Sequence, residues 1–107
     1  MTEADYHRVA STTDLHDGDV IEAQVGRTVL AIYKIDGGFY ATEGICTHAY
    51  ARMAEGYVEG DIIECPYHGG AFDIRTGKAV AAPCTQDLKT FPVRIDGDAI
   101  LVGVASP

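Results

Sequence analysis

The chain has 107 residues, 47% of them hydrophobic, which is enough for one small globular domain. Its formal net charge is −8, from 16 acidic and 8 basic residues, and this argues against nucleic-acid binding, because phosphates attract Lys and Arg. The first residues are acidic with no apolar run after them, and no stretch approaches the roughly 20 apolar residues of a membrane span, so neither a signal peptide nor a membrane protein is expected.

The predicted elements are short strands separated by turn signals, without a long helical period. Ser11 and Asp14 stand at capping-box spacing and predict a single capped turn. Gly26-Arg27 lies between two strand-like runs, as in a hairpin. The strands predicted in this part of the chain are 6–10, 20–25, 28–35 and 39–42, with further turns at 17–19 and 36–38.

The segment from 43 to about 84 differs from the rest, because glycine recurs throughout it. Its strand candidates are 61–64, 71–74 and 78–82. Ordinary strands are predicted again at 89–95 and 99–104, around a turn at 96–98.

These elements predict an all-β protein with a single domain, 1–107, made of antiparallel strands. A sandwich-like or barrel-like base is expected from 1–42 and 85–107. A loop-rich subdomain of about 43–84 is expected as an insertion into that base.

The insertion carries two short motifs of the same order, Cys46-Thr-His48 and Cys65-Pro-Tyr-His68, with sixteen residues between His48 and Cys65. Thiolate and imidazole ligands suit both iron–sulfur centres and zinc. Structural zinc sites favour two to four residues between paired ligands, whereas Thr47 alone separates the first pair. The order Cys then His in both loops permits two Cys on one iron and two His on the other. An odd count of three Cys, two of them at metal-type spacing, fits a reducing cytoplasm better than a disulfide scaffold.

Glycine and proline surround these motifs. Gly44 precedes the first loop, and Gly69 and Gly70 follow the second. Glycine lets the main chain approach a bound group and present N–H donors to it, and Pro66 stiffens the second loop. A shallow site lined by backbone is therefore expected.

The sequence resembles the Rieske ferredoxins of bacterial aromatic ring-hydroxylating dioxygenase systems, such as those for naphthalene, biphenyl and toluene. The resemblance covers most of the chain and is strongest from 43 to 95. The matching segments are Cys46-Thr-His48, Ala51-Arg-Met53, Gly56-Tyr-Val-Glu-Gly60, Ile63-Glu-Cys-Pro66, His68, Phe72-Asp73, Thr76-Gly77-Lys78 and Ala82-Pro83.

The resemblance implies a Rieske fold and one [2Fe–2S] cluster. Cys46 and Cys65 would hold the inner ferric ion, and His48 and His68 the outer iron near the surface. It also implies a monomeric, cytoplasmic electron carrier without a catalytic site, placed between an NAD(P)H-dependent flavin reductase and a terminal Rieske oxygenase. The alternatives are a small subunit of another redox enzyme, such as nitrite reductase, and a structural zinc module.

High-potential Rieske proteins carry an extra Cys in each loop, joined in a disulfide, and hydroxyl groups that bond the cluster sulfurs. The corresponding positions here are Ala51 and Tyr67 for the disulfide, and Gly70 and Phe72 for the hydroxyls. Fewer donors stabilise the reduced cluster less, so the resemblance implies a low reduction potential.

Three weaker signals accompany the motifs. Cys84, the third cysteine, is expected to be an inert thiol. Tyr50, Tyr67 and Phe72 are expected to shield the cluster from water. The segment 43–68 holds one Arg or Lys, Arg52, among five acids that form either a docking surface for basic partners or only a solvated face. These acids are Glu43, Glu55, Glu59, Asp61 and Glu64.

Overall fold

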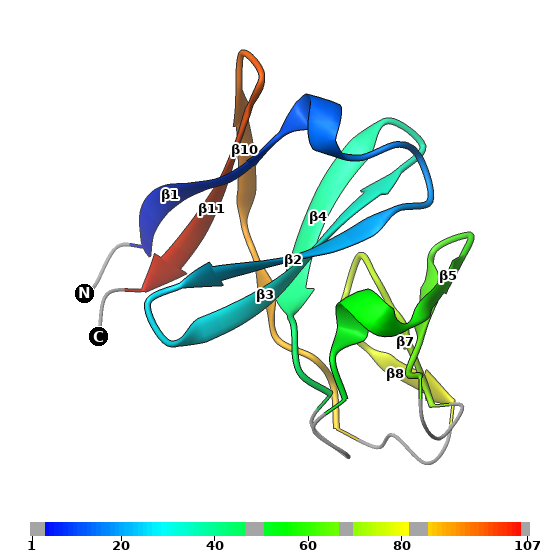
Figure 1. The fold of residues 1–107 in the computed structure, drawn as a ribbon. Helices are drawn as coiled ribbons and strands as arrows, with labels where there is room; N and C mark the ends of the chain where they lie inside the picture. Colours follow the sequence, from blue (N-terminus) through cyan, green and yellow to red (C-terminus); the bar gives the residue numbers. More distant parts are fainter. Residues whose placement is uncertain (1–3, 47–50, 67–69, 82–85, 106–107) are drawn as a thin grey trace.

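The computed structural model describes residues 4–46, 51–66, 70–81 and 86–105 (Figure 1). Almost all of the regular structure is antiparallel strand, which confirms the all-β class. The strands are β1 (Ala4–Ser11), β2 (Val20–Val25), β3 (Thr28–Ile35), β4 (Gly38–Glu43), β5 (Tyr57–Glu59), β6 (Ile62–Glu64), β7 (Ala71–Asp73), β8 (Ala79–Ala81), β9 (Thr90–Phe91), β10 (Val93–Asp96) and β11 (Ala99–Ala105). Two 3₁₀ turns, η1 (Thr12–Asp14) and η2 (Met53–Glu55), complete the described elements.

The strands form three sheets. The first has the order β1-β11-β10, the second β2-β3-β4-β9 and the third β5-β6-β7-β8. Figure 1 shows the third sheet, in green to yellow, beside the second and away from the first. No described helix is long and apolar enough to cross a membrane.

The predicted turns of the base are present because their glycines adopt positive φ angles. The hairpin between β2 and β3 turns at Gly26, with φ 59°, and pairs Val25 with Thr28. Asp36 and Gly37, with φ 49° and 80°, connect β3 to β4, and two successive positive φ angles are typical of a tight hairpin turn. The predicted capped turn is also confirmed, since the Ser11 N–H donates to the Asp14 carboxylate at 2.8 Å.

The predicted strand 89–95 is wrong in one respect, because the chain changes sheet at Pro92. β9 pairs with β4 in the second sheet, whereas β10 pairs with β11 in the first. Proline has no N–H to donate to a ladder, while its carbonyl accepts a hydrogen bond from the Gly103 N–H at 2.9 Å. Pro92 thus divides one predicted strand into two.

Strand β3 lies between two hydrophobic cores. Its residues 30–33 are all fully buried, and they alternate between the two sides. Leu30 and Ile32 face the base core, with Leu15, Ile100 and Val102. The other side of β3 faces a second cluster, the site core, which consists of Ala31, Tyr33, Ile35, Cys46, Ala51, Met53, Ile63, Cys65, Phe72, Ile74 and Leu88.

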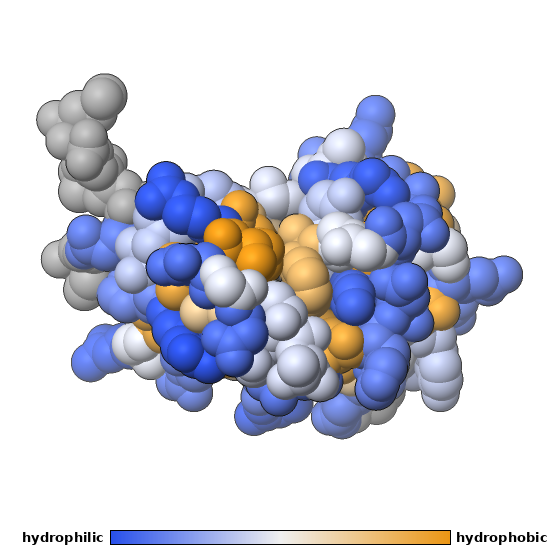
Figure 2. Space-filling view, turned by 90° about the horizontal axis from the view of Figure 1, so that it is seen from above, coloured by the Kyte–Doolittle hydropathy of each residue, from blue (hydrophilic) through white to orange (hydrophobic). Residues whose placement is uncertain are grey.

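Two elements near the motifs were not predicted. η2 follows the first loop directly, and it buries Met53 completely. β5 has only three residues, of which Tyr57 is 66% exposed. Such short segments show too few residues for a hydrophobic period to be recognised. The face seen in Figure 2 is mostly hydrophilic, with apolar residues in small separate patches.

Arg75, in the turn between β7 and β8, joins the third sheet to the base. Its guanidinium donates to the Tyr40 hydroxyl at 3.0 Å and to the Asp61 carboxylate at 3.3 Å. It also lies over the Tyr40 ring, 5.1 Å from the centroid, and 3.8 Å from Asp36. The Asp61 charge, followed by Tyr40, raises the pKa of Arg75 above its ordinary value.

We expect Arg75→Gln to lower the midpoint of thermal unfolding by a few degrees, because it removes both ion pairs and the ring contact. The effect stays small because the side chain is 43% exposed and water screens its charge. Lys78→Gln, an exposed change in the same connection, serves as the control. Equal midpoints for the two variants, measured by circular dichroism, would exclude a bridging role for Arg75.

Candidate metal centre

The two Cys occupy the same position in two similar loops. The Cys46 N–H donates to the Ala51 carbonyl at 2.7 Å, and the Cys65 N–H donates to the Gly70 carbonyl at 2.7 Å. An antiparallel residue pair closes the base of each loop, at Ile45↔Arg52 and Glu64↔Ala71. Each Cys is thus the first residue of a closed hairpin loop, which positions it by main-chain hydrogen bonds.

Both Cys side chains are buried in the site core. Cys46 is 1% exposed and Cys65 is 2% exposed. They share that core with Phe72 and Met53, which are fully buried. Phe72 therefore lies in the same buried core as both Cys, and its role in shielding a cluster from water stays a prediction. Two thiols that enter one apolar environment from two loops are suited to hold a group between those loops.

The other predicted ligands, His48 and His68, lie outside the described residues, as do Tyr50, Tyr67 and Cys84. Within the described ranges, therefore, no group of three or more His, Cys, Asp or Glu side chains is placed to hold a metal ion. The donor chemistry of the described pair fits an iron–sulfur cluster, since two soft thiolates suit one iron. By the same criterion it also fits zinc.

Gly44 has a structural role that differs from the one predicted. A Cβ at this position would lie 2.8 Å from the main-chain carbon of Leu30 and from the side chain of Val29. The Gly44 N–H donates to the Val29 carbonyl, and the Gly44 carbonyl accepts from Met53, both at 2.8 Å. Gly44 thus allows the chain that leaves β4 to run tightly beside the start of β3, and this contact places the first loop.

Gly56 brings the two loops together, a role that the sequence did not reveal. A Cβ there would lie 2.2 Å from the main-chain oxygen of Glu64, the residue before Cys65. The Gly56 N–H donates to the Met53 carbonyl at 2.9 Å and ends η2. The chain leaving the first loop therefore passes directly against the strand that enters the second.

An ion pair attaches the first loop to the base. Arg52, the residue after that loop, donates from its guanidinium to the carboxylate of Glu22 on β2. Both side chains are partly exposed, so the contact contributes more to the orientation of the loop than to stability. Arg52, the one Arg or Lys in the segment 43–68, is therefore paired with Glu22 and not with the five acids of that segment.

Tyr33 places a satisfied polar group in the site core. Its hydroxyl lies 2.8 Å from that of Thr42, which donates its own proton to the Glu43 carbonyl at 2.9 Å. Because a Thr hydroxyl has one proton, the Tyr33 hydroxyl is the donor to Thr42. Burial raises the pKa of Tyr33, and the hydrogen bond with Thr42 opposes this effect. The side chain is therefore neutral at physiological pH.

The five acids of the segment 43–68 differ in whether their carboxylates have a partner within the described residues. Asp61 is paired with Arg75, and Glu43 accepts a hydrogen bond from the Lys89 N–H at 2.7 Å. Glu55, Glu59 and Glu64 are exposed, and the described part of the chain holds no cation paired with them. Three of the five carboxylates therefore remain available to a partner.

Comparisons with known proteins identify the family of the chain. Residues 5–92 match the Rieske [2Fe-2S] domain family. The chain is 46% identical over 93 residues to the ferredoxin component of a naphthalene 1,2-dioxygenase system from Pseudomonas putida, covering 87% of this chain and 89% of that one.

Two solved structures show the same fold. A Sphingomonas yanoikuyae B1 ferredoxin has a TM-score of 0.87 and 38% identity, covering 96% of this chain and 100% of its own. The second is described as a complex of reduced oxygenase and oxidised ferredoxin in carbazole 1,9a-dioxygenase. It has a TM-score of 0.87 and 39% identity, and 92% of each chain is covered.

The family match resolves the choice between iron–sulfur and zinc that the ligand types left open. The resemblance noted from the motifs is confirmed over most of the chain. This chain belongs to the Rieske [2Fe-2S] domain family, and one Rieske cluster is its resident cofactor.

Proposed function

We propose that the protein is the ferredoxin component of a bacterial aromatic ring dioxygenase system. It takes single electrons from an NAD(P)H-dependent flavin reductase and passes them to the terminal oxygenase in the cytoplasm. The identity of 46% to a ferredoxin component carries this proposal. The similarity to a ferredoxin from an oxygenase complex supports the terminal oxygenase as partner. The chain is an electron carrier and has no catalytic role of its own.

We further propose Cys46, His48, Cys65 and His68 as the cluster ligands. The twin loops and the shared burial of the two Cys in the site core support the thiolate pair. When bound, the cluster accepts and returns one electron. The protein contributes two closed loops, an apolar surrounding that excludes water from the thiolates, and His side chains at the proposed electron exit.

The organisation proposed for the chain is a single domain with a cluster-binding insertion of about 43–84. In support, β5, β6, β7 and β8 pair only with one another, while the strands before and after them build the first two sheets.

Reconstitution tests the function directly. The purified protein is added to a flavin reductase and a Rieske oxygenase of an aromatic dioxygenase system, with NADH and aromatic substrate. We expect hydroxylated product to form in proportion to the ferredoxin. A ferredoxin that the reductase reduces, but that no such oxygenase reoxidises, would contradict the proposal.

The reduction potential is a second expectation. Ala51 and Phe72 are buried, in the positions that the resemblance assigns to the disulfide and to one hydroxyl donor. Neither side chain can donate a hydrogen bond to a sulfide or to a thiolate. We therefore expect a potential near the low end of the Rieske range, about −150 mV. Protein-film voltammetry measures it, and a potential above zero would show that other donors replace those missing.

The three available acids predict salt-dependent electron transfer. Rising ionic strength should slow the reaction with a basic partner, because screening weakens charge attraction. Glu64→Gln should show a lower rate at low salt and a weaker salt dependence than the unaltered protein. Asp96→Asn, which removes an exposed charge from the first sheet, is the matched control. Stopped-flow rates that do not change with salt would assign these acids to a solvated face only.

A further inference from the structure

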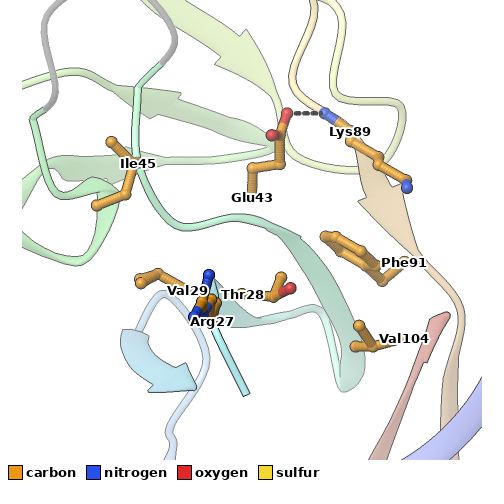
Figure 3. Close-up of a pocket in the computed structure, with 8 residues that line it drawn as sticks. All are labelled: Arg27, Thr28, Val29, Glu43, Ile45, Lys89, Phe91 and Val104. Carbon is orange, nitrogen blue, oxygen red and sulfur yellow. Dashed lines mark hydrogen bonds between the residues drawn. The ribbon is translucent and has the colours of Figure 1, made fainter. Parts of the chain in front are cut away.

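A cavity lies in the base, beside the chain segment that leads into the first Cys loop (Figure 3). Its volume is about 380 Å³, within the range of small-molecule sites. It opens among the β2–β3 turn, the start of β3, the end of β4, β9 and the end of β11. The lining residues are Arg27, Thr28, Val29, Glu43, Ile45, Lys89, Phe91 and Val104.

Four of the eight described residues that line the cavity are apolar. Val29, Ile45, Phe91 and Val104 contribute aliphatic groups and one aromatic ring. Figure 3 shows these side chains spread around the cavity rather than gathered on one side. An apolar body of a ligand would therefore find contacts on several sides, and such contacts drive binding in concave sites.

The polar part of the wall carries two cations, Arg27 and Lys89. Within the described residues, no carboxylate lies within 4.0 Å of either cation. The Lys89 ammonium lies 5.4 Å from the centroid of the Phe91 ring, at the cavity. Arg27 and Lys89 thus add two positive charges to one cavity wall in a chain with twice as many acidic as basic residues.

The one carboxylate in the wall does not neutralise them. Glu43 accepts a hydrogen bond from the Lys89 main-chain N–H at 2.7 Å, and its own N–H donates to the Lys89 carbonyl at 2.9 Å. Figure 3 shows the carboxylate turned toward that N–H. The described lining residues therefore carry a net positive charge of one, from two cations and one anion, in a protein whose net charge is −8.

We propose that this cavity binds a small carboxylate with an apolar body, such as an aromatic monocarboxylate. The carboxylate pairs with Arg27 by a charge-assisted hydrogen bond, which is stronger than a neutral one, and Lys89 on the other side of the cavity adds to the positive charge of the wall. The ring lies against Val29, Phe91 and Val104. Ile45 lines the cavity and directly precedes Cys46. The bound ligand therefore contacts the segment that enters the first Cys loop.

Calorimetric titration of the cluster-loaded protein tests the site with three probes. We expect benzoate to bind with a dissociation constant on the order of 1 mM or below. Acetate keeps the charge without the ring, and benzyl alcohol keeps the ring without the charge. Each should bind about tenfold more weakly, because one of the two contacts is lost. Benzoate should also shift the methyl resonances of Val104.

Variants locate the binding. The double variant Arg27→Gln, Lys89→Gln should weaken benzoate binding about tenfold, while the Gln at 89 keeps the main-chain bond to Glu43. Arg94→Gln removes an exposed Arg of the first sheet outside the cavity and should leave binding unchanged. An unaltered visible spectrum shows that each variant retains the cluster. Any of three results would overturn the proposal. Benzoate binding would be undetectable, acetate would bind as tightly as benzoate, or the double variant would bind benzoate as tightly as the unaltered protein.

Discussion

Cys65→Ser should abolish the Rieske cluster. The purified variant should lack the visible absorption of the cluster and the electron paramagnetic resonance signal after dithionite, and its iron content should fall close to zero. The reason is that a serine hydroxyl is a harder ligand than a thiolate and is not deprotonated at neutral pH. Cys65 contributes its thiol from within the site core, where it is 2% exposed, so solvent offers no ready replacement ligand.

The matched control is Cys84→Ser, which should retain both the spectrum and the iron. Cys84 lies outside the described residues, and the sequence predicts that it is not a ligand. Loss of the cluster also removes the stabilisation that binding provides, so far-UV circular dichroism must accompany the iron assay. A Cys65→Ser variant with an unaltered Rieske signal would exclude this residue as a ligand, whatever its stability.

Gly77→Ala should destabilise the protein by about 2–5 kcal/mol. Gly77 has a φ of 77°, a conformation that costs a residue with a Cβ about 1–2 kcal/mol. The added Cβ would lie 2.0 Å from the main-chain oxygen of Leu88, and such overpacking adds about 1–3 kcal/mol. The main chain of Leu88 cannot easily move away from residue 77, since the Leu88 N–H donates to the Gly77 carbonyl at 2.7 Å.

Gly60→Ala separates these two causes. Gly60 has a φ of 60°, but a Cβ there would meet nothing within 4 Å. This variant should therefore lose only the conformational part, about 1–2 kcal/mol. Denaturant unfolding of the cluster-loaded proteins, followed by circular dichroism, compares them. Equal losses in both variants would show that the contact with Leu88 does not determine the effect.

The turns and most strands were predictable because their signals are local. Gly26 and Gly37 mark turns through the backbone angles that they permit, and β2 and β3 have the predicted bounds. Asp73 is another local signal, since its carboxylate accepts from the N–H groups of Arg75 and Thr76 and shapes the turn before Gly77. Neighbouring residues suffice for such features, so a single sequence reveals them.

Contacts between distant segments were not predictable in the same way. The period of residues 89–95 indicates a strand, but it does not show that the two halves pair with different sheets. Nor does it reveal that Gly77 touches Leu88, or that Gly56 touches Glu64. The Gly56 contact lies at the base of the β5–β6 hairpin, and the Gly77 contact joins the β7–β8 turn to the residues before β9. Such close approaches depend on the packing of the whole folded chain.

The two Cys-His motifs alone indicated a metal centre, but their ligand types suited both an iron–sulfur cluster and zinc. Cys46 and Cys65 recur at ligand spacing with His48 and His68, and ligand spacing is a property of short loops. That the two Cys share one buried core became visible only in the folded chain, where Gly44 lies tightly beside β3 and Gly56 lies against β6. A few adjacent residues are enough to supply metal ligands at a suitable spacing. The burial of a side chain and the close approach of two chain segments depend instead on the whole folded chain.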